Sequence, residues 1–338
     1  MNLLLDTEQQ QLVAACRALY RREASPASVR AAEPLGYDAD LWNSLAKTGV
    51  VAMAVPEDQG GWGASMLDLV LVAEQHGRAV APAPLVDAQA AARLLARSGA
   101  AGASALAAAM AGAELVVLAP RPARGGRLPL VPAGAVADWV VARVDDAIVM
   151  LNGRGDHVEN LGGMPAADLV AGADATVLLA GEAADAAWES AIDDWFLLMS
   201  GCLVGVAARA LEIGVDYAKG RQAFGSAIGS FQAVAHPLAD SATAIDGARL
   251  LSYRAAWSVA EEPAHASELG ALAYAMAYEA ARDTTRRSLH IHGGYGFIME
   301  QDIQLYFRRA RAWAQVLGTS AEAFDRAADR RYGPRAAA

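Results

Sequence analysis

The chain has 338 residues, a hydrophobic content of 54% and a formal net charge of -10 at pH 7. A chain of this length and composition can bury a large core, and we expect it to form two or three domains. The negative charge repels phosphate backbones and no run rich in lysine and arginine offsets it, so we expect no nucleic-acid partner.

The first part of the chain, residues 1–113, is predicted to be a helical domain. Asp6 is expected to cap the first helix, and a second helix is predicted over residues 38–47. A turn rich in glycine follows, after which Ser65 is expected to cap another helix. Helices rich in alanine and leucine are then predicted over residues 84–98 and 101–113.

Composition changes at Glu114, where short β-branched runs separated by turn residues predict a small β domain over residues 114–183. The predicted strands are 115–118, 139–142, 147–150 and 176–179. Helical periodicity returns over residues 184–338, in long segments at about 186–220, 230–261, 265–291 and 301–318. Four long helices with short connections predict an antiparallel bundle, so the fold class is α+β and mostly α.

Several features bear on the location of the protein. The N-terminus lacks the pattern of a secretory signal, and the longest apolar run, residues 196–208, is too short to cross a bilayer. We expect that run to belong to a buried helix and the chain to have no membrane span. Cys16 and Cys202 lie far apart without a paired spacing, which argues against a disulfide framework or a thiolate metal site. A cytoplasmic location is therefore expected.

One candidate binding segment lies near the end of a predicted helix. Arg221 and Phe224 are three residues apart and can project from one face, while Gly225 can leave the helix in the left-handed conformation. A guanidinium there can make bidentate bonds to a pyrophosphate, and the ring can cover an aromatic cofactor. The alternative is a cationic helix terminus that complements the helix dipole, beside a phenylalanine of the core.

A second candidate segment closes a later helix with three glycines in residues 289–297. Glycines such as Gly293 and Gly294 let the backbone approach a ligand closely and expose N–H groups. His290 and His292 also raise the possibility of a metal, but no acidic or cysteine ligand stands near them, so no metal site is expected. Taken alone, the glycines are also compatible with a simple helix stop.

These segments together resemble the acyl-CoA dehydrogenase family, and the resemblance covers essentially the whole chain. Its specificity comes from four motifs in family order, which are residues 220–225, Phe231-Gln232, residues 292–297 and residues 308–311. The resemblance implies an N-terminal helical domain, a middle β-barrel and a C-terminal four-helix bundle. It also implies FAD as the cofactor. Arg221 and Phe224 then contact FAD bound mainly by a neighbouring subunit, Gln232 lies near the same cofactor, and His290, Gly293 and Gly294 line its adenosine half.

The residues that perform family catalysis are missing. In the family a carboxylate removes the α-proton of an acyl-CoA while a hydride passes from the β-carbon to the flavin. Leu317 occupies the usual base position, and Trp195 occupies the position that some relatives use instead. Neither side chain can accept a proton. Asp193 and Asp194 are weak candidates for a relocated base, and the alternative for both is a charge at a helix N-terminus.

The middle domain departs from the family as well. Relatives carry a Thr-Glu-Pro-like segment and a Trp-Ile-Thr-like strand that hold the flavin ring, whereas residues 118–126 of this chain match neither. The combination resembles the small, catalytically incomplete subunits of the bacterial α2β2 acyl-CoA dehydrogenases that act on steroid side-chain CoA thioesters. Such a subunit implies a partner that supplies the glutamate, an acyl-CoA substrate and an electron-transfer acceptor.

Two other functions remain open at this point. One is a self-sufficient homomeric dehydrogenase with a relocated base. The other is a non-enzymatic scaffold that no longer holds FAD, and the retention of Arg221, Phe224 and Gln232 argues against it.

Overall fold

The computed structural model describes residues 4–333, and contacts within the chain divide it into two compact units. The helical unit consists of Met1–Pro26, Val70–Ala81 and Phe196–Ala338, and the mixed unit consists of Ala27–Leu69 and Pro82–Trp195. The long helices α4 (Met66–Ala79) and α7 (Gly181–Gly220) contribute residues to both units, and the first residue of α2, Pro26, belongs to the helical unit.

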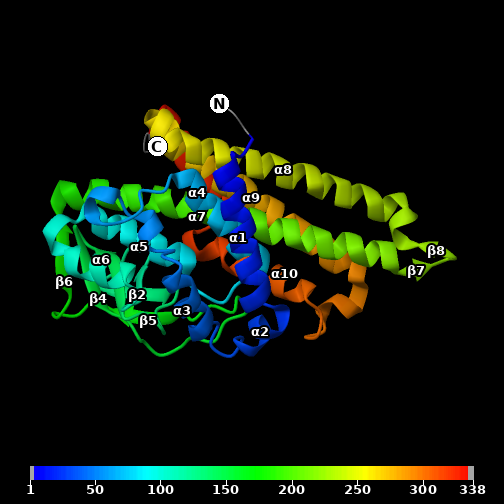
Figure 1. The fold of residues 1–338 in the computed structure, drawn as a ribbon, viewed down its shortest axis with the longest axis horizontal. Helices are drawn as coiled ribbons and strands as arrows, with labels where there is room; N and C mark the ends of the chain where they lie inside the picture. Colours follow the sequence, from blue (N-terminus) through cyan, green and yellow to red (C-terminus); the bar gives the residue numbers. More distant parts are fainter. Residues whose placement is uncertain (1–3, 334–338) are drawn as a thin grey trace. The chain divides into compact units, whose positions relative to one another are not determined.

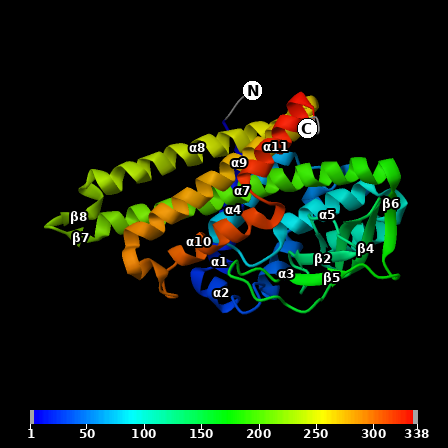
Figure 2. The same cartoon turned by 180° about the vertical axis from the view of Figure 1, so that it is seen from behind.

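In the helical unit, α9 packs against α8, α10 and α11 (Figures 1 and 2). The helices that lie wholly in this unit are α1 (Thr7–Glu23), α8 (Gln232–Glu261), α9 (Pro263–His292), α10 (Ile303–Ala312) and α11 (Ser320–Tyr332). The buried face of α9 consists largely of alanine, with Tyr274 and Tyr278 as its large members. Small side chains let neighbouring helices approach closely, which explains how an alanine-rich sequence builds this core.

Glycine sets the distance between α4 and α7 in the helical unit. A Cβ added at Gly77 would lie 1.8 Å from the carbonyl oxygen of Cys202, and one at Gly205 would lie 1.9 Å from that of Glu74. No side chain fits at either distance, so the two helices meet backbone to backbone. This contact fixes the part of α7 that leads to the candidate site.

The mixed unit combines short helices with open sheets. Its helices are α2 (Pro26–Ala31), α3 (Ala39–Lys47), α5 (Leu85–Arg97) and α6 (Ala103–Met110), and its strands are β1 (Val116–Leu118), β2 (Arg127–Val131), β3 (Trp139–Val144), β4 (Ala147–Asn152), β5 (Ala167–Val170) and β6 (Thr176–Ala180). The larger sheet has the order β1-β3-β4-β6, and β2 pairs with β5 in a separate antiparallel pair. Over the part of the chain that the structure describes, these sheets do not close into the expected barrel. The register of β2 with β5 shifts between Leu128 and Val131, where Leu130 has a φ of 49°, and this irregularity interrupts the ladder.

The local predictions are largely confirmed. Asp6 and Gln9 form a capping box at the start of α1, and Ser65 accepts a hydrogen bond from the backbone of Asp68 at the start of α4. The four predicted strands correspond to β1, β3, β4 and β6. Strands β2 and β5 were not predicted, because neither has a long β-branched run and Pro129 lies inside β2. The division into three domains and the four-helix arrangement stay predictions.

The apolar run at residues 196–208 is part of α7 and is buried almost throughout, as predicted. By length and composition alone, α7 is apolar enough to cross a membrane, but 78% of its most apolar stretch is buried inside the protein. It therefore has the burial of a core helix.

Candidate functional site

The first candidate segment is a tight hairpin at the end of α7. The helix ends at Gly220, and β7 (Gln222–Ala223) pairs with β8 (Ser226–Ala227) across a turn formed by Phe224 and Gly225. Their φ angles are 51° and 80°, so both lie in the left-handed region that two-residue hairpin turns require. The predicted end of the helix near residue 220 and the left-handed conformation of Gly225 are confirmed, but Phe224 and Gly225 lie in a hairpin turn beyond the helix. Arg221 and Phe224 do not share a helix face.

The Phe224 ring is 97% exposed. Within the chain, its ring contact is an edge-on approach to Phe231 with centroids 6.2 Å apart. A positive φ is unfavourable for a residue with a Cβ, and exposing a large ring gains nothing from burial. Two unfavourable features at one residue point to a surface completed by something outside this chain.

Arg221 and Gln232 flank this hairpin. The backbone of Arg221 is held on both sides, since its N–H donates to Tyr217 at 2.9 Å and its carbonyl accepts from Ile228 at 2.8 Å. Its side chain is exposed, and no carboxylate among residues 4–333 forms an ion pair with it. Gln232 is the exposed first residue of α8. The hairpin thus presents a fixed backbone with a guanidinium available to an anion.

The second candidate segment is the turn after α9. Gly293 has a φ of 61° and a ψ of -148°, a conformation that a side chain would strain. Gly294 has no positive φ, and a Cβ added there would meet no atom within 4 Å. Neither backbone conformation nor packing inside the chain requires glycine at 294. The open space above it therefore suits the close approach of a ligand or a partner chain.

The two histidines of this segment lie in different surroundings. His290 is exposed, whereas His292 is buried, stacks on Tyr217 with ring centroids 3.9 Å apart, and bonds through Nδ1 to the Ser288 carbonyl at 2.7 Å. Burial lowers the pKa of His292 and outweighs the opposing effect of that bond. His292 is a packing residue. No group of three His, Cys, Asp or Glu residues suited to a metal occurs in the described part of the chain.

The structure brings the two segments together. The stacking of Tyr217 on His292 joins the last turn of α7 to the last turn of α9, and both views show the β7–β8 hairpin and the turn after α9 at one end of these helices (Figures 1 and 2). A Cβ at Gly214 would lie 2.7 Å from the Ser288 hydroxyl, so the two helices are in close contact there. Arg221, Phe224, His290, Gly293 and Gly294 thus belong to one exposed end of the helical unit, which we call the exposed helix end.

The usual base position holds no proton acceptor. Leu317 is the half-buried last residue of a short 3₁₀ segment, Ala314–Leu317. Thr319 follows and forms a capping box with Glu322 at the start of α11. Glu322 accepts hydrogen bonds from the Thr319 N–H at 2.6 Å and its hydroxyl at 3.1 Å. That nearby carboxylate is occupied as a helix cap.

The alternative base position is also filled by a packed side chain. Trp195 is 0% exposed, and its Nε1 donates to the Asp87 carboxylate at 3.0 Å. Burial raises the pKa of Asp87 to about 7, although the bond from Trp195 acts in the opposite direction. Asp87 was not predicted as a site residue, because a single acid within the alanine-rich segment 84–98 gives no sign of its burial.

The two weak base candidates lie in the middle of α7, not at a helix start as expected. Asp194 is 4% exposed and pairs with Arg93 at 2.9 Å and Arg97 at 2.7 Å. Both guanidinium groups contact this carboxylate, so Asp194 links α7 to α5 through two ion pairs. Asp193 is half-buried on the same helix. The interpretation of these acids as charges at a helix N-terminus was wrong, because α7 begins at Gly181.

The region that corresponds to the flavin-holding segment of relatives is a reverse turn. Arg124 and Arg127 exchange backbone hydrogen bonds of 2.9 and 3.1 Å across Gly125 and Gly126, which both have positive φ. Residues 118–126 contain no hydroxyl side chain. The turn therefore offers only backbone groups as hydrogen-bonding partners, apart from its arginines.

The arginines before Leu317 have mainly packing roles. Arg309 is fully buried with its guanidinium over the Trp313 ring, and Arg311 lies over Phe307, 3.7 Å from the ring centroid. Arg308 donates from Nε to Gln304 at 2.7 Å.

Comparison with known proteins gives the family. Residues 6–114 match the N-terminal domain of acyl-CoA dehydrogenases, and residues 197–330 match their C-terminal domain. Acyl-CoA dehydrogenase IpdE2 of Mycolicibacterium smegmatis is 33% identical over 323 residues, which cover 94% of this chain and 97% of that relative. IpdE2 of Mycobacterium tuberculosis is 32% identical over 327 residues, with coverages of 94% and 96%.

Solved structures agree with this assignment. A chain of the ChsE4-ChsE5 complex from Mycobacterium tuberculosis has a TM-score of 0.85 at 25% identity, covering 99% of this chain and 100% of that one. A variant of the Tcur3481-Tcur3483 steroid ACAD also has a TM-score of 0.85 at 25% identity, with coverages of 96% and 97%. The chain belongs to the acyl-CoA dehydrogenase family, whose members are oxidoreductases that act on acyl-CoA thioesters.

Proposed function

We propose that this chain is the subunit of an FAD-dependent acyl-CoA dehydrogenase that contributes part of the FAD site, while a partner subunit supplies the catalytic glutamate. The observation that carries the proposal is a contrast within one chain. Arg221, Phe224, His290, Gly293 and Gly294 are all exposed at the exposed helix end, whereas both base positions, Leu317 and Trp195, are apolar.

The exposed helix end fits the phosphate and adenosine part of FAD. An exposed guanidinium at Arg221 suits a pyrophosphate, and the open space above Gly294 admits a flat group close to the backbone. His290 can donate or accept a hydrogen bond at the same end, and the exposed ring of Phe224 can cover an apolar surface. Residues 118–126 do not fit the flavin ring in the same way, since they lack the hydroxyl groups that relatives use.

When bound, FAD would supply the acceptor for the hydride that leaves the β-carbon of the acyl-CoA thioester. In this arrangement Arg221 neutralises negative charge, Gly293 and Gly294 permit close approach, and Phe224 excludes water from a neighbour's site. Trp195 and Leu317 move no proton. Abstraction of the α-proton is therefore assigned to the partner's glutamate.

A relocated base within this chain is not favoured. Asp194 forms ion pairs with Arg93 and Arg97, and Glu322 caps α11 through Thr319. Asp87 accepts a hydrogen bond from Trp195 and is buried. Each acid has a structural function that proton abstraction would disrupt.

The relatives support a heteromeric assembly and a substrate class. Two of the similar structures are described as a ChsE4-ChsE5 complex and as a steroid ACAD with two named components. We propose by analogy an α2β2 enzyme that introduces an α,β double bond into a steroid side-chain CoA thioester. An electron-transfer acceptor then reoxidises the enzyme. A cytoplasmic location is part of the same proposal.

The test is purification of the chain alone and after co-expression with a candidate acyl-CoA dehydrogenase partner that carries the catalytic glutamate. We expect the chain alone to lack stoichiometric flavin absorbance, and the complex to carry flavin at about one per heterodimer and to dehydrogenate acyl-CoA. A homo-oligomer with stoichiometric FAD and robust turnover would establish the self-sufficient enzyme instead. A complex that forms without binding FAD would establish the scaffold.

A further inference from the structure

A second site lies within the helical unit, where the ends of α1 and α4 meet α7 and α10. A cavity of about 350 Å³ opens there, a size typical of small-molecule sites. It has no residue in common with the exposed helix end. Its charged lining residues are Arg17, Arg21, Arg78, Arg209 and Glu212.

Positive charge dominates this cavity, which we call the arginine cavity. Four guanidinium groups face one carboxylate among the lining residues, which leaves a surplus of three positive charges in a chain whose net charge is -10. Like charges gathered at one place repel each other, and the repulsion is stronger where water is partly excluded. A cluster of this kind is stabilised when an anion binds to it.

The single carboxylate is already used. Glu212 pairs with Arg78 at 2.6 Å and with Arg209 at 2.9 Å. Burial opposes ionisation of Glu212, but the hydrogen bonds from the two arginines outweigh it, so its pKa is lowered and it is charged at neutral pH. Glu212 therefore holds the Arg78 and Arg209 guanidinium groups in place. It does not form an ion pair with Arg17 or Arg21.

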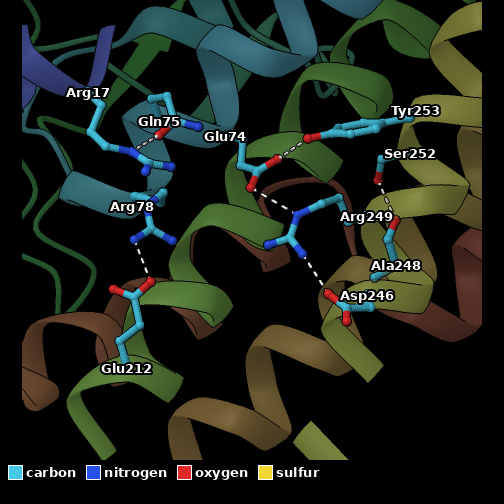
Figure 3. A network of polar contacts seen from close by, with 10 residues as sticks. All are labelled: Arg17, Glu74, Gln75, Arg78, Glu212, Asp246, Ala248, Arg249, Ser252 and Tyr253. Carbon is cyan, nitrogen blue, oxygen red and sulfur yellow. Dashed lines mark hydrogen bonds and ion pairs between the residues drawn. The ribbon is translucent and has the colours of Figure 1, made fainter. Parts of the chain in front are cut away.

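The other two arginines lie on one face of α1. Arg17 and Arg21 are four residues apart and exposed, and the Arg17 Nε donates to the neutral side chain of Gln75 at 3.3 Å. Figure 3 shows Arg17 with Gln75 and Arg78 with Glu212, apart from the Glu74–Arg249–Tyr253 cluster formed on another side of α4. Neither Arg17 nor Arg21 forms an ion pair with a carboxylate of the described chain.

The remaining lining residues are mostly apolar. Val80, Leu305 and the rings of Tyr20 and Tyr306 form an apolar wall, and all four are buried. The Tyr306 hydroxyl donates to the Arg78 carbonyl at 2.9 Å, which ties α10 to the end of α4. A ligand here meets guanidinium groups on one side and a hydrophobic surface on the other.

We propose that the arginine cavity binds a small organic phosphomonoester, with the phosphate on the arginines and the organic body against the apolar wall. A phosphate dianion matches a surplus of three positive charges better than a single carboxylate does, and guanidinium groups bind phosphate oxygens in bidentate pairs. The site is separate from the FAD half-site. Its function does not depend on the proposed role of the exposed helix end.

The experiment is isothermal titration calorimetry on the full chain, alone and in its complex, with phenyl phosphate, inorganic phosphate and benzoate as probes. We expect saturable binding of phenyl phosphate, weaker binding of inorganic phosphate and the weakest binding of benzoate. The double variant Arg17→Gln/Arg21→Gln should weaken phenyl phosphate binding by at least about tenfold. Both side chains are exposed, so thermal unfolding of the variant should match that of the wild type.

Two controls separate the cavity from general charge effects. Arg22→Gln removes a neighbouring cation of α1 that does not line the cavity and should change the affinity by less than about twofold. Arg221→Ala removes the guanidinium of the exposed helix end and should also leave binding unchanged. The proposal is overturned if neither phosphate probe binds saturably, if Arg22→Gln weakens binding as much as the double variant, or if only Arg221→Ala abolishes it.

Discussion

The exposed helix end and the surroundings of Trp195 show opposite relations between a side chain and its own fold. Phe224 is 97% exposed in a strained turn, and Gly294 leaves space that nothing in the chain occupies. Trp195 is 0% exposed and bonded to a buried acid, and Asp194 beside it is held by two arginines. The first region keeps an exposed ring and open space, whereas the second is filled by packed, hydrogen-bonded side chains.

This difference indicates how to recognise a subunit that contributes only part of a binding site shared with a partner. A residue whose conformation or exposure is unfavourable in its own chain requires an explanation from outside that chain, such as a ligand or a partner. A well-packed residue requires none. A subunit that donates binding groups but performs no chemistry is expected to show this division. Each of the following predictions tests one side of it.

The largest effect is expected on catalysis. The chain alone should dehydrogenate acyl-CoA about 10²–10⁴-fold more slowly than the complex, because loss of a general base typically reduces the rate by that factor. The measurement is reduction of an electron-accepting dye under saturating acyl-CoA. Asp194→Asn within the complex is the control, and it should not lower the rate through loss of a base. Equal rates for the chain and the complex would remove the distinction between the two regions.

The packed region around Trp195 should make the stability of the folded protein depend on pH. The pKa of Asp87 is raised by burial to about 7 in the folded protein, whereas an unfolded chain titrates it near its ordinary value. The folded state therefore binds the proton more tightly, so wild-type stability should fall as pH rises between about 4 and 7. Above pH 7 the loss is complete and amounts to about 4 kcal/mol.

Asp87→Asn tests this directly, because the amide oxygen can still accept the Trp195 hydrogen bond and carries no charge. Urea unfolding at pH 5 and pH 8 should show the variant gaining stability relative to the wild type at the higher pH. Asp146→Asn, an exposed acid of the same unit, is the control and should show no such trend. A constant difference across the range would mean that Asp87 does not titrate in this window.

Substitutions at the exposed helix end should change the affinity for FAD. Arg221→Ala should leave folding and assembly intact, because the side chain is exposed, but should weaken FAD binding by about tenfold or more, since a charge-assisted bond contributes roughly 1.5–3 kcal/mol. Fluorescence titration of FAD into the apo-complex measures this. Lys219→Ala removes a nearby exposed cation and should have little effect. If both variants bind FAD like the wild type, Arg221 is only a charge at a helix end.

The smallest effect is expected at Gly294. An alanine there should not destabilise the isolated chain, because its Cβ meets nothing within 4 Å, but it should weaken FAD binding severalfold if a ligand approaches the backbone. Gly247 in α8 is a matched control, since its Cβ also meets nothing. Gly247→Ala should stabilise the chain by about 0.5–1 kcal/mol without changing FAD affinity.

Much of the secondary structure was predictable from the sequence, because it depends on local patterns of residue type and spacing. Caps such as Asp6 and Ser65, the four β-branched strands and the long helices follow from residue type and spacing. The family resemblance identified Arg221, Phe224 and the glycine turn as a group, and the structure places them at one end of the helical unit. Their roles at FAD stay predictions.

Other features depend on contacts that spacing does not reveal. The hairpin after Gly220 was not predicted, because Phe224 adopts a positive φ that only a glycine would have signalled, so Arg221 and Phe224 were wrongly placed on one helix face. Asp194 was assigned to a helix start, because the length of α7 before it was underestimated. Asp87 and the arginine cavity were missed because each is assembled from residues far apart in the chain. A closed barrel was expected from resemblance alone, and the open sheets correct it.

The backbone contact between α4 and α7 limits how this protein can change. At Gly77 and Gly205 there is no room for even one methyl group, and any larger residue must push two main chains apart. Both the arginine cavity and the exposed helix end are reached through helices anchored at this crossing. Variation at either site can therefore alter its side chains, while the close approach of α4 and α7 stays the same.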